Sequence, residues 1–216
     1  MKKYEHLKKK AIVLRRKGHS LDEISEMLSL GKTTIFYWIR GARLPATEKQ
    51  RACARAAGMA NKEKHNNLRQ LAYKEGLQEY ERWKALPTFL DFVVIYLTEG
   101  FRRTRNQVAV SNSNPSIMRL SLYWIDKLRN PQRSIDYGLQ CHIDNDENAV
   151  KEFWARHLDI ESAKIKVFRK SNSGNLDGRQ WRSMNGVLQI RVNDTYFRAK
   201  LQAWMDLLQK EWQNRI

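Results

Sequence analysis

The chain has 216 residues, a length that suits one large domain or two small ones. Its 40 lysines and arginines exceed its 23 aspartates and glutamates by 17, which predicts a polyanionic partner such as nucleic acid. Seven tryptophans and 42% hydrophobic residues exclude a basic tail without a core, and two cysteines exclude a disulfide scaffold. A charge excess that serves only solubility is the alternative.

Targeting signals are not expected. Residues 1–10 are charged, with no apolar core behind them, so they do not predict a signal peptide. The most apolar run, Phe89 to Leu97, contains Asp91 and falls well short of the ~20 residues needed to cross a bilayer. We therefore expect a cytoplasmic, nucleoid-associated protein with no membrane partner.

Residues 1–44 predict three short helices. Apolar spacing places the first over residues 5–17. Ser20-Leu21-Asp22-Glu23 has the pattern of a capping box and begins the second helix. Ser29-Leu30-Gly31 forms a tight turn, and the third helix covers residues 32–40.

This arrangement predicts a helix-turn-helix DNA-binding domain. The run LDEISEMLSLGKTTIFYWIRG resembles the resolvase-like and transposase-like version of that module. In such modules the start of the third helix enters the major groove. We expect four residues to reach base edges: Lys32, Thr33, Phe36 and Tyr37. We expect Thr34 and Arg40 to bind phosphate. A three-helix unit that contacts only protein is the alternative.

Residues 45–86 predict a basic helical connector. The segment is rich in Ala, Lys, Arg, Gln and Glu, which favours a long helix, either continuous or interrupted at Gly58. Arg51, Arg55 and Arg69 contribute to its basic character. Either it lies along a phosphate backbone or it is a solvated spacer. Pro87 marks the boundary with the next domain.

Residues 87–216 predict an α+β domain. The apolar run that ends at Glu99-Gly100 predicts a helix, and a basic turn, residues 101–106, follows it. Alternating apolar residues then predict strands that begin near residues 107, 137, 165 and 188. We expect the order helix, two strands, helix, strand, helix, two strands, helix, which adds one strand beside the first of these four.

If the apolar sides of the strands share one core, the opposite side displays polar residues. We expect six of them to contact bases and phosphates, and none of the six is a carboxylate: Gln107, Gln140, His142, Lys166, Gln189 and Arg191. Arg102, Arg103 and Arg105 add to this surface from the basic turn. The pattern predicts a DNA-facing saddle, although any half-solvated sheet alternates in the same way.

The runs YLTEG and NSNP carry a second resemblance. Residues 87–216 resemble one LAGLIDADG homing-endonuclease unit, with Glu99-Gly100 in place of the terminal Asp-Gly. The whole chain resembles bacterial helix-turn-helix proteins with such a domain. The resemblance implies an α/β saddle, Glu99 as the carboxylate that holds Mg²⁺, and Asn112 as the residue that positions water or phosphate. Because the chain has one motif, the resemblance implies a homodimer.

The chain departs from that family at several positions. Bulky side chains, Val93, Val94, Tyr96 and Leu97, stand where close helix packing favours Gly or Ala, and Arg191 is the nearest match to the late basic residue. Two functions therefore lead, and RNA binding or an accessory role in recombination is the remaining alternative. One is a sequence-specific double-stranded DNA-binding protein, a transcriptional regulator that needs no cofactor and does not cleave. The other is a metal-dependent site-specific endonuclease. Glu99 could also be a helix-end acid paired with Arg102 or Arg103.

Overall fold

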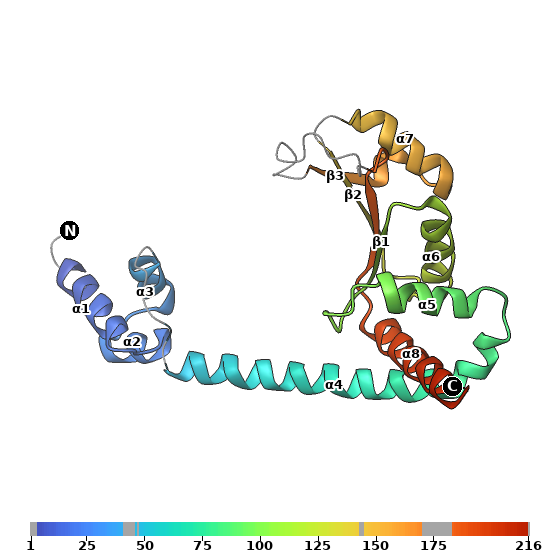
Figure 1. The fold of residues 1–216 in the computed structure, drawn as a ribbon. Coiled ribbons are helices and arrows are strands. Elements are labelled where there is room, and N and C mark those ends of the chain that lie inside the picture. Colours follow the sequence, from blue (N-terminus) through green and yellow to red (C-terminus); the bar gives the residue numbers. More distant parts are fainter. Residues whose placement is uncertain (1–3, 41–45, 47, 143–144, 170–182, 216) are drawn as a thin grey trace. The chain divides into compact units, whose positions relative to one another are not determined.

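The computed structural model describes residues 4–40, 46, 48–142, 145–169 and 183–215 (Figure 1). The chain divides into two compact units, residues 1–64 and 65–216. Over the described residues the fold is α+β, with eight α-helices and one four-stranded mixed sheet. No helix in these residues combines the length and apolar composition that crossing a bilayer requires.

The first unit has three helices around a small core: α1 (Glu5–Arg16), α2 (Leu21–Leu28) and α3 (Lys32–Ile39). The core consists of Ala11, Ile24, Ile35 and Ile39. The predicted capping box is confirmed, because Glu23 N–H donates to Ser20 Oγ at 3.2 Å and Ser20 N–H donates to the Glu23 carboxylate at 2.7 Å. Ser29, in the left-handed conformation (φ 49°), ends α2 and starts the turn to α3.

Helix α4 (Glu48–Lys84) crosses the division between the units. The predicted long helix is confirmed, and of its two expected forms the continuous one is found, because α4 runs through Gly58 without a break. All of residues 48–64 in this helix are exposed. Its second half is no solvated spacer, because Ala72, Gly76 and Tyr80 are buried. These three residues are spaced four apart, so they share one face of the helix.

That face packs on α8 (Thr195–Arg215), the last helix of the chain. A Cβ on Gly76 would lie 3.0 Å from the Cβ of Ala203 and from the backbone of Lys200, so a glycine allows this close approach. The indole of Trp204 donates to the Gly76 carbonyl at 3.0 Å. The residues predicted as one connector, 45–86, therefore contribute to both units.

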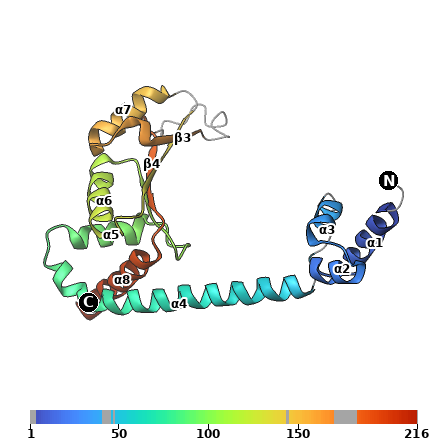
Figure 2. The same ribbon diagram turned by 180° about the vertical axis from the view of Figure 1, so that it is seen from behind.

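The sheet of the second unit has the order β1-β4-β2-β3. Its strands are β1 (Val108–Asn112), β2 (Ile135–Cys141), β3 (Ile165–Arg169) and β4 (Val187–Val192). β4 pairs antiparallel with both β1 and β2, whereas β2 and β3 are parallel. Helices α5 (Phe89–Glu99), α6 (Pro115–Leu128) and α7 (Glu147–Leu158) lie on one side of the sheet, as both views show (Figures 1 and 2).

One strand, rather than the predicted two, follows α5. Residues 101–107 form an irregular loop that one isolated bridge, Gly100 to Val110, joins to β1. Phe101 N–H donates to the Ala109 carbonyl at 2.8 Å. The loop carries consecutive charged and polar residues without apolar alternation, so it has no side that could be buried in a sheet.

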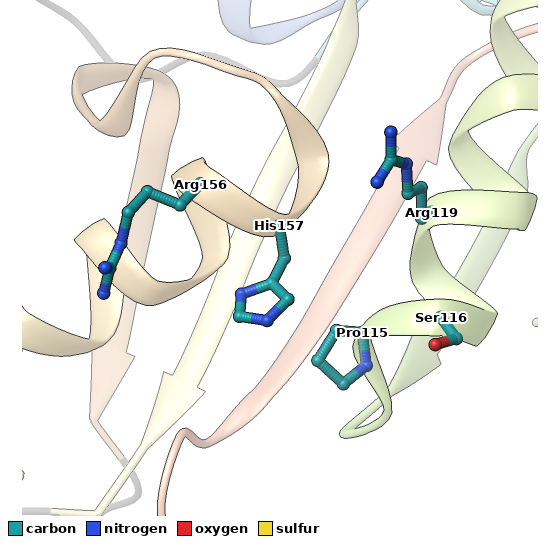
Figure 3. Close-up of a pocket in the computed structure, with 5 residues that line it drawn as sticks. All are labelled: Pro115, Ser116, Arg119, Arg156 and His157. Carbon is teal, nitrogen blue, oxygen red and sulfur yellow. The ribbon is translucent and has the colours of Figure 1, made fainter.

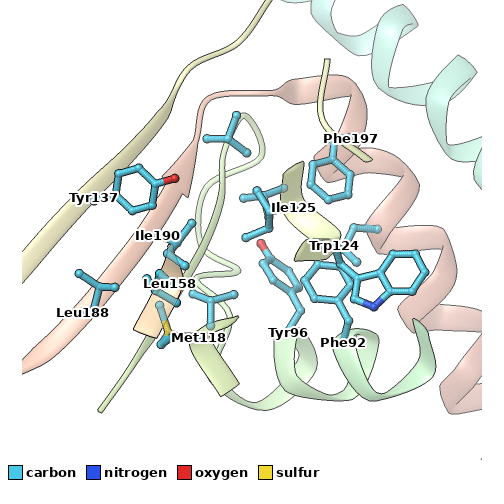
Figure 4. Packing of buried hydrophobic residues seen from close by; sticks show 14 of the residues in the cluster. Phe92, Tyr96, Met118, Trp124, Ile125, Tyr137, Leu158, Leu188, Ile190 and Phe197 are labelled. Atoms are coloured by element: carbon cyan, nitrogen blue, oxygen red, sulfur yellow. The ribbon is translucent and has the colours of Figure 1, made fainter. Parts of the chain in front are cut away.

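The core between helices and sheet is rich in aromatic residues. Trp124, Trp154 and Trp204 are fully buried, and each indole N–H has an acceptor; Trp124, for example, donates to Thr88 Oγ1 at 3.1 Å. Figure 4 shows Phe92 and Tyr96 of α5 within this cluster. The apolar face of α5 is therefore buried inside its own unit, and the helix ends at an exposed Glu99.

Candidate nucleic-acid interface

The first unit presents one helix face with the predicted DNA-contacting residues. All six are exposed: Lys32, Thr33, Thr34, Phe36, Tyr37 and Arg40. We call them the α3 surface. Phe36 is 50% exposed and Tyr37 is 58% exposed, while Ile35 and Ile39 fix the opposite side of α3 in the core. Large apolar side chains that stay exposed on an anchored helix are typical of a contact surface.

The side chains of the α3 surface are ordered by their neighbours. The Arg40 guanidinium lies 4.8 Å from the centre of the Tyr37 ring, and the Phe36 and Tyr37 rings meet edge to face at 5.9 Å. Lys32 Nζ lies 2.7 Å from Asp22 Oδ1. This hydrogen-bonded ion pair lowers the pKa of Asp22 and raises that of Lys32. Lys32 is thus held by an acid of the preceding helix.

The beginning of α3 can also accept an anion. Its N-cap residue is Gly31, which has no side chain to cap the helix, and the first turn contains no acid. The first N–H groups of a helix lack partners within the helix and attract phosphate. Thr33 and Thr34 lie in this turn, and Thr34 is one of the two residues predicted to bind phosphate.

The second unit has a sheet face opposite the helices, which we call the open face. Strand register places Ser111, Gln189, Gly138 and Lys166 in one row across all four strands. The polar and aromatic side chains of the open face are Ser111, Asp136, Gln140, Lys166, Phe168, Gln189 and Arg191, and Ala109, Gly138 and Val187 also lie on it. Four of the six predicted sheet residues, Gln140, Lys166, Gln189 and Arg191, therefore lie on this face.

The other two predicted sheet residues lie beside the strands. Gln107 precedes β1 and is half-buried, and its side-chain oxygen accepts from Thr104 Oγ1 at 3.4 Å. His142 follows β2 and is also half-buried, and its backbone N–H donates to Asn145 Oδ1 at 2.9 Å. Both are thus placed in turns at the sheet margin.

The open face is not free of carboxylates, which corrects the basis of the predicted saddle. Asp136 lies opposite Arg191 in the register, and Arg191 Nη2 lies 3.1 Å from Asp136 Oδ2. Gln189 Nε2 donates to Ser111 Oγ at 3.1 Å. Part of the polar surface is therefore satisfied within the chain. Asp136 was not predicted on this face because it comes just before the alternating residues that marked the strand.

Phe168 is a second feature of the open face that sequence reasoning missed. It is 57% exposed and lies over Gly138, where a Cβ would stand 3.3 Å from its ring. The sequence did contain a signal for it, because Phe168 stands at an outward position in the alternating pattern of its strand.

The three basic-turn residues line a pocket of about 510 Å³ with two more arginines from distant parts of the chain, Arg69 of α4 and Arg198 of α8. We call this site, with Arg102, Arg103 and Arg105, the arginine pocket. Tyr73 and Gln202 also line it. Among the described residues that line the pocket, none is acidic. Arg198 was missed because it lies in a helix whose spacing indicated only core residues.

A second basic pocket, of about 320 Å³, lies between α6 and α7. Figure 3 shows Pro115, Ser116 and Arg119 on one side and Arg156 and His157 on the other. His157 Nδ1 lies 2.7 Å from the Phe153 carbonyl, and its ring is 4.2 Å from the Phe153 ring. This pocket has two exposed arginines, both on helices.

Glu99 and Asn112, the predicted catalytic residues, have different environments. Glu99 is exposed, and within the described part of the chain it makes no ion pair, so the alternative pairing with Arg102 or Arg103 is not found. A Cβ on Gly100 would collide with the carbonyl and ring of Tyr96, which explains the glycine after Glu99. Over the described residues, no group of three or more His, Cys, Asp or Glu gathers at one point.

Asn112 has a structural role in the NSNP run. Its Oδ1 accepts from Asn114 N–H at 2.8 Å. Asn114 in turn caps α6, accepting from Ser116 N–H at 2.9 Å and from Ile117 N–H at 3.4 Å, and Pro115 occupies the first turn of that helix.

Comparison with known proteins gives no assignment. No family model, no curated protein and no solved structure matches this chain. The chemistry of these surfaces is therefore the basis for a functional conclusion.

Proposed function

We propose that the protein is a sequence-specific double-stranded DNA-binding protein that acts as a transcriptional regulator. In this proposal the three-helix unit is a helix-turn-helix and α3 enters the major groove. One observation carries it: the α3 surface keeps two large aromatic side chains and two cations exposed on a helix whose other side is fixed in a core. The charge of +17 supports a polyanionic partner.

The chemistry of the α3 surface divides into two groups. Lys32 can donate to guanine O6 and N7, and the Phe36 ring or the Thr33 methyl group can contact a thymine methyl. Arg40 and Thr34 suit phosphate, since a guanidinium or hydroxyl donates to oxygens of any sequence. The first group would give specificity and the second would fix the position of the helix.

The second unit would add contacts that are less specific. Lys166 and Gln140 of the open face are both exposed, and the arginines of the loop 101–107 add positive charge. A homodimer, which the family resemblance implies, would double these contacts and require an inverted repeat in the DNA.

The test begins by selecting bound duplexes from a random pool with the full chain, and then titrating the selected duplex. Phe36→Ala should weaken binding by ~1–3 kcal/mol and relax the preference at one base position. Val13→Ala is the control, because Val13 is an exposed apolar residue of α1, at 47%. Equal losses for both variants, or equal losses on random DNA, would contradict base contact by α3.

The selected sequence also reports on assembly. An inverted repeat with half-sites about one helical turn apart is expected for a dimer. A single asymmetric site would instead indicate that one chain binds alone.

Site-specific cleavage is the second candidate function. The observation in its favour is Glu99, an exposed carboxylate at the end of α5 that has no ion pair within the described residues. A divalent ion takes several oxygen ligands, and one carboxylate does not fit that need, so a second chain would have to supply another.

Cleavage and simple binding are separated by incubating the selected duplex with the full chain and Mg²⁺. Glu99→Gln should abolish any cleavage and leave binding unchanged if Glu99 holds the metal. Asp91→Asn is the matched control, because Asp91 is an exposed acid on the same helix. Binding without cleavage by the wild-type chain supports the regulator.

A further inference from the structure

The arginine pocket gathers five arginines of the second unit around one cavity. Three segments that are far apart in the chain build it: Arg69 comes from α4, Arg102, Arg103 and Arg105 from the loop after α5, and Arg198 from α8. Five guanidinium groups carry a formal charge of +5, because arginine stays protonated under all ordinary conditions. Within the described residues the lining contains no carboxylate that would offset this charge.

Arg198 is the deepest member, with 6% of its surface exposed. Its Nη1 donates to Gln202 Oε1 at 3.1 Å and its Nη2 to the Arg102 carbonyl at 3.4 Å. Its Nε is buried and has no hydrogen-bond partner among the residues described. The guanidinium also lies 5.6 Å from the centre of the Tyr96 ring. These contacts hold the group in place, but all of them are to neutral partners.

A buried charge without a counter-charge is costly, because water no longer solvates it and no acid replaces the water. An acid that contacts the pocket lining, Asp206, accepts from Tyr73 Oη at 2.9 Å and from Gln202 Nε2 at 2.8 Å. It therefore positions two lining side chains and makes no ion pair with Arg198 in the described part of the chain. The arrangement is complete only when an anion enters from outside.

The three loop arginines also lack a counter-charge, although they are exposed to solvent. Arg102, Arg103 and Arg105 are exposed, and no ion pair to any of their side chains occurs among the described residues. Arg69 is half-buried and donates to Asn66 Oδ1, another neutral acceptor. Guanidinium groups bind phosphate through two parallel hydrogen bonds, so several of them around one cavity favour a ligand with several phosphate oxygens.

We infer that the arginine pocket binds the phosphate groups of a multiply charged phosphate ligand. At about 510 Å³ the pocket lies within the range of small-molecule sites, so it can hold more than one phosphate group. Arg198 provides a fixed, buried charge, and the three loop arginines add exposed charges to the lining. Two sources offer this chemistry: adjacent phosphates of a nucleic-acid backbone, and a free phosphorylated small molecule. The inference does not depend on the α3 surface.

The test uses the full chain and inorganic tripolyphosphate, with binding measured by calorimetry. Saturable binding with one ligand per chain is expected. The double variant Arg103→Ala/Arg105→Ala removes two exposed cations and should weaken binding about tenfold or more, because charge-assisted hydrogen bonds are lost. The double variant Arg119→Ala/Arg156→Ala is the matched control. It removes the same charge from the pocket between α6 and α7, which also has exposed arginines, and should change affinity less than about twofold.

Competition with duplex DNA then distinguishes the two sources. A random-sequence duplex that displaces tripolyphosphate identifies backbone phosphate as the natural ligand. A duplex that binds while tripolyphosphate stays in place identifies a free phosphorylated molecule. Absence of saturable binding, several ligands per chain, or equal weakening in both double variants would overturn the inference. None of these results bears on base contact by Phe36, so the two proposals fail separately.

Discussion

The α3 surface and the open face of the sheet carry similar polar and aromatic side chains, but these side chains have different partners within the chain. On α3, the Tyr37 ring has aromatic and cation–π contacts with its own helix neighbours, Phe36 and Arg40, and the pairing with a carboxylate is that of Lys32 with Asp22. On the sheet, Arg191 pairs with Asp136 and Gln189 pairs with Ser111. An exposed side chain that pairs within the chain is therefore a weaker sign of a binding surface than an exposed side chain without such a partner.

The difference follows from the geometry of the two elements. A strand in the middle of a sheet has neighbours on both sides, and opposite residues stand about 5 Å apart, so polar side chains readily pair across strands. A helix with one buried side leaves its other side chains with few neighbours except those three or four positions away. A recognition surface on a helix thus keeps more of its hydrogen-bonding capacity for a ligand.

The largest predicted effect compares two aromatic residues of almost equal exposure, Tyr37 at 58% and Phe168 at 57%. Tyr37→Ala should weaken binding to the selected duplex by ~1–3 kcal/mol, because it removes a ring at the base edges. Phe168→Ala should change the affinity by less than about 0.5 kcal/mol, as is usual for surface substitutions. Fluorescence anisotropy at one fixed salt concentration measures both. Equal losses would mean that the open face binds DNA as strongly as α3.

The next prediction concerns the ion pair on the open face. Asp136→Asn releases Arg191 and raises the net charge by one, so the slope of log affinity against log salt should steepen by up to about one unit if Arg191 then reaches a phosphate. Stability should fall by at most about 1 kcal/mol, since both side chains are partly exposed, at 43% and 35%. Titrations over a salt series measure the slope. An unchanged slope would place Arg191 away from bound DNA.

The variant Arg191→Ala tests the same ion pair from its other side. Because Asp136 already offsets the charge of Arg191, the loss of Arg191 should alter DNA affinity less than the loss of Lys166, which is exposed on the same face of the sheet. Lys166→Ala is therefore the matched variant for Arg191→Ala, with the same change in charge. A larger loss for Arg191→Ala would show that the ion pair opens on binding.

Local signals in the sequence were sufficient for the first unit. The capping box at Ser20 and the turn at Ser29 depend on contacts between residues no more than five apart, and the structure confirms the helix boundaries that they predicted. Alternation over β4 also marked a strand with one buried side, because Leu188, Ile190 and Val192 are buried. Each of these features is encoded within one element.

Features that depend on distant segments were not predictable in this way. The pairing of Asp136 with Arg191 requires the strand register, and the arginine pocket requires three segments to meet. The packing of α4 on α8 was hidden for a different reason. Gly76 is buried because it has no side chain, so the apolar face of α4 contains a residue that usually signals a break. The absence of a second strand before β1 reflects a loop whose charged residues carry no periodicity.

The smallest predicted effect concerns the acid that holds Lys32. Asp22→Asn frees the Lys32 ammonium group, which should tighten binding to duplex DNA about twofold to threefold at low salt and less at high salt. The pair also makes a pH-dependent contribution to stability. Lys32 lowers the pKa of Asp22 in the folded chain, so this contribution is present above the ordinary carboxyl pKa of 3.8 and is lost as pH falls through the lower folded value. The difference in melting temperature between the wild-type chain and Asp22→Asn should therefore be constant near neutral pH and shrink in acid. A difference that grows on acidification would mean that Asp22 is not stabilised by Lys32, and tighter DNA binding by the variant would then have to come from net charge alone.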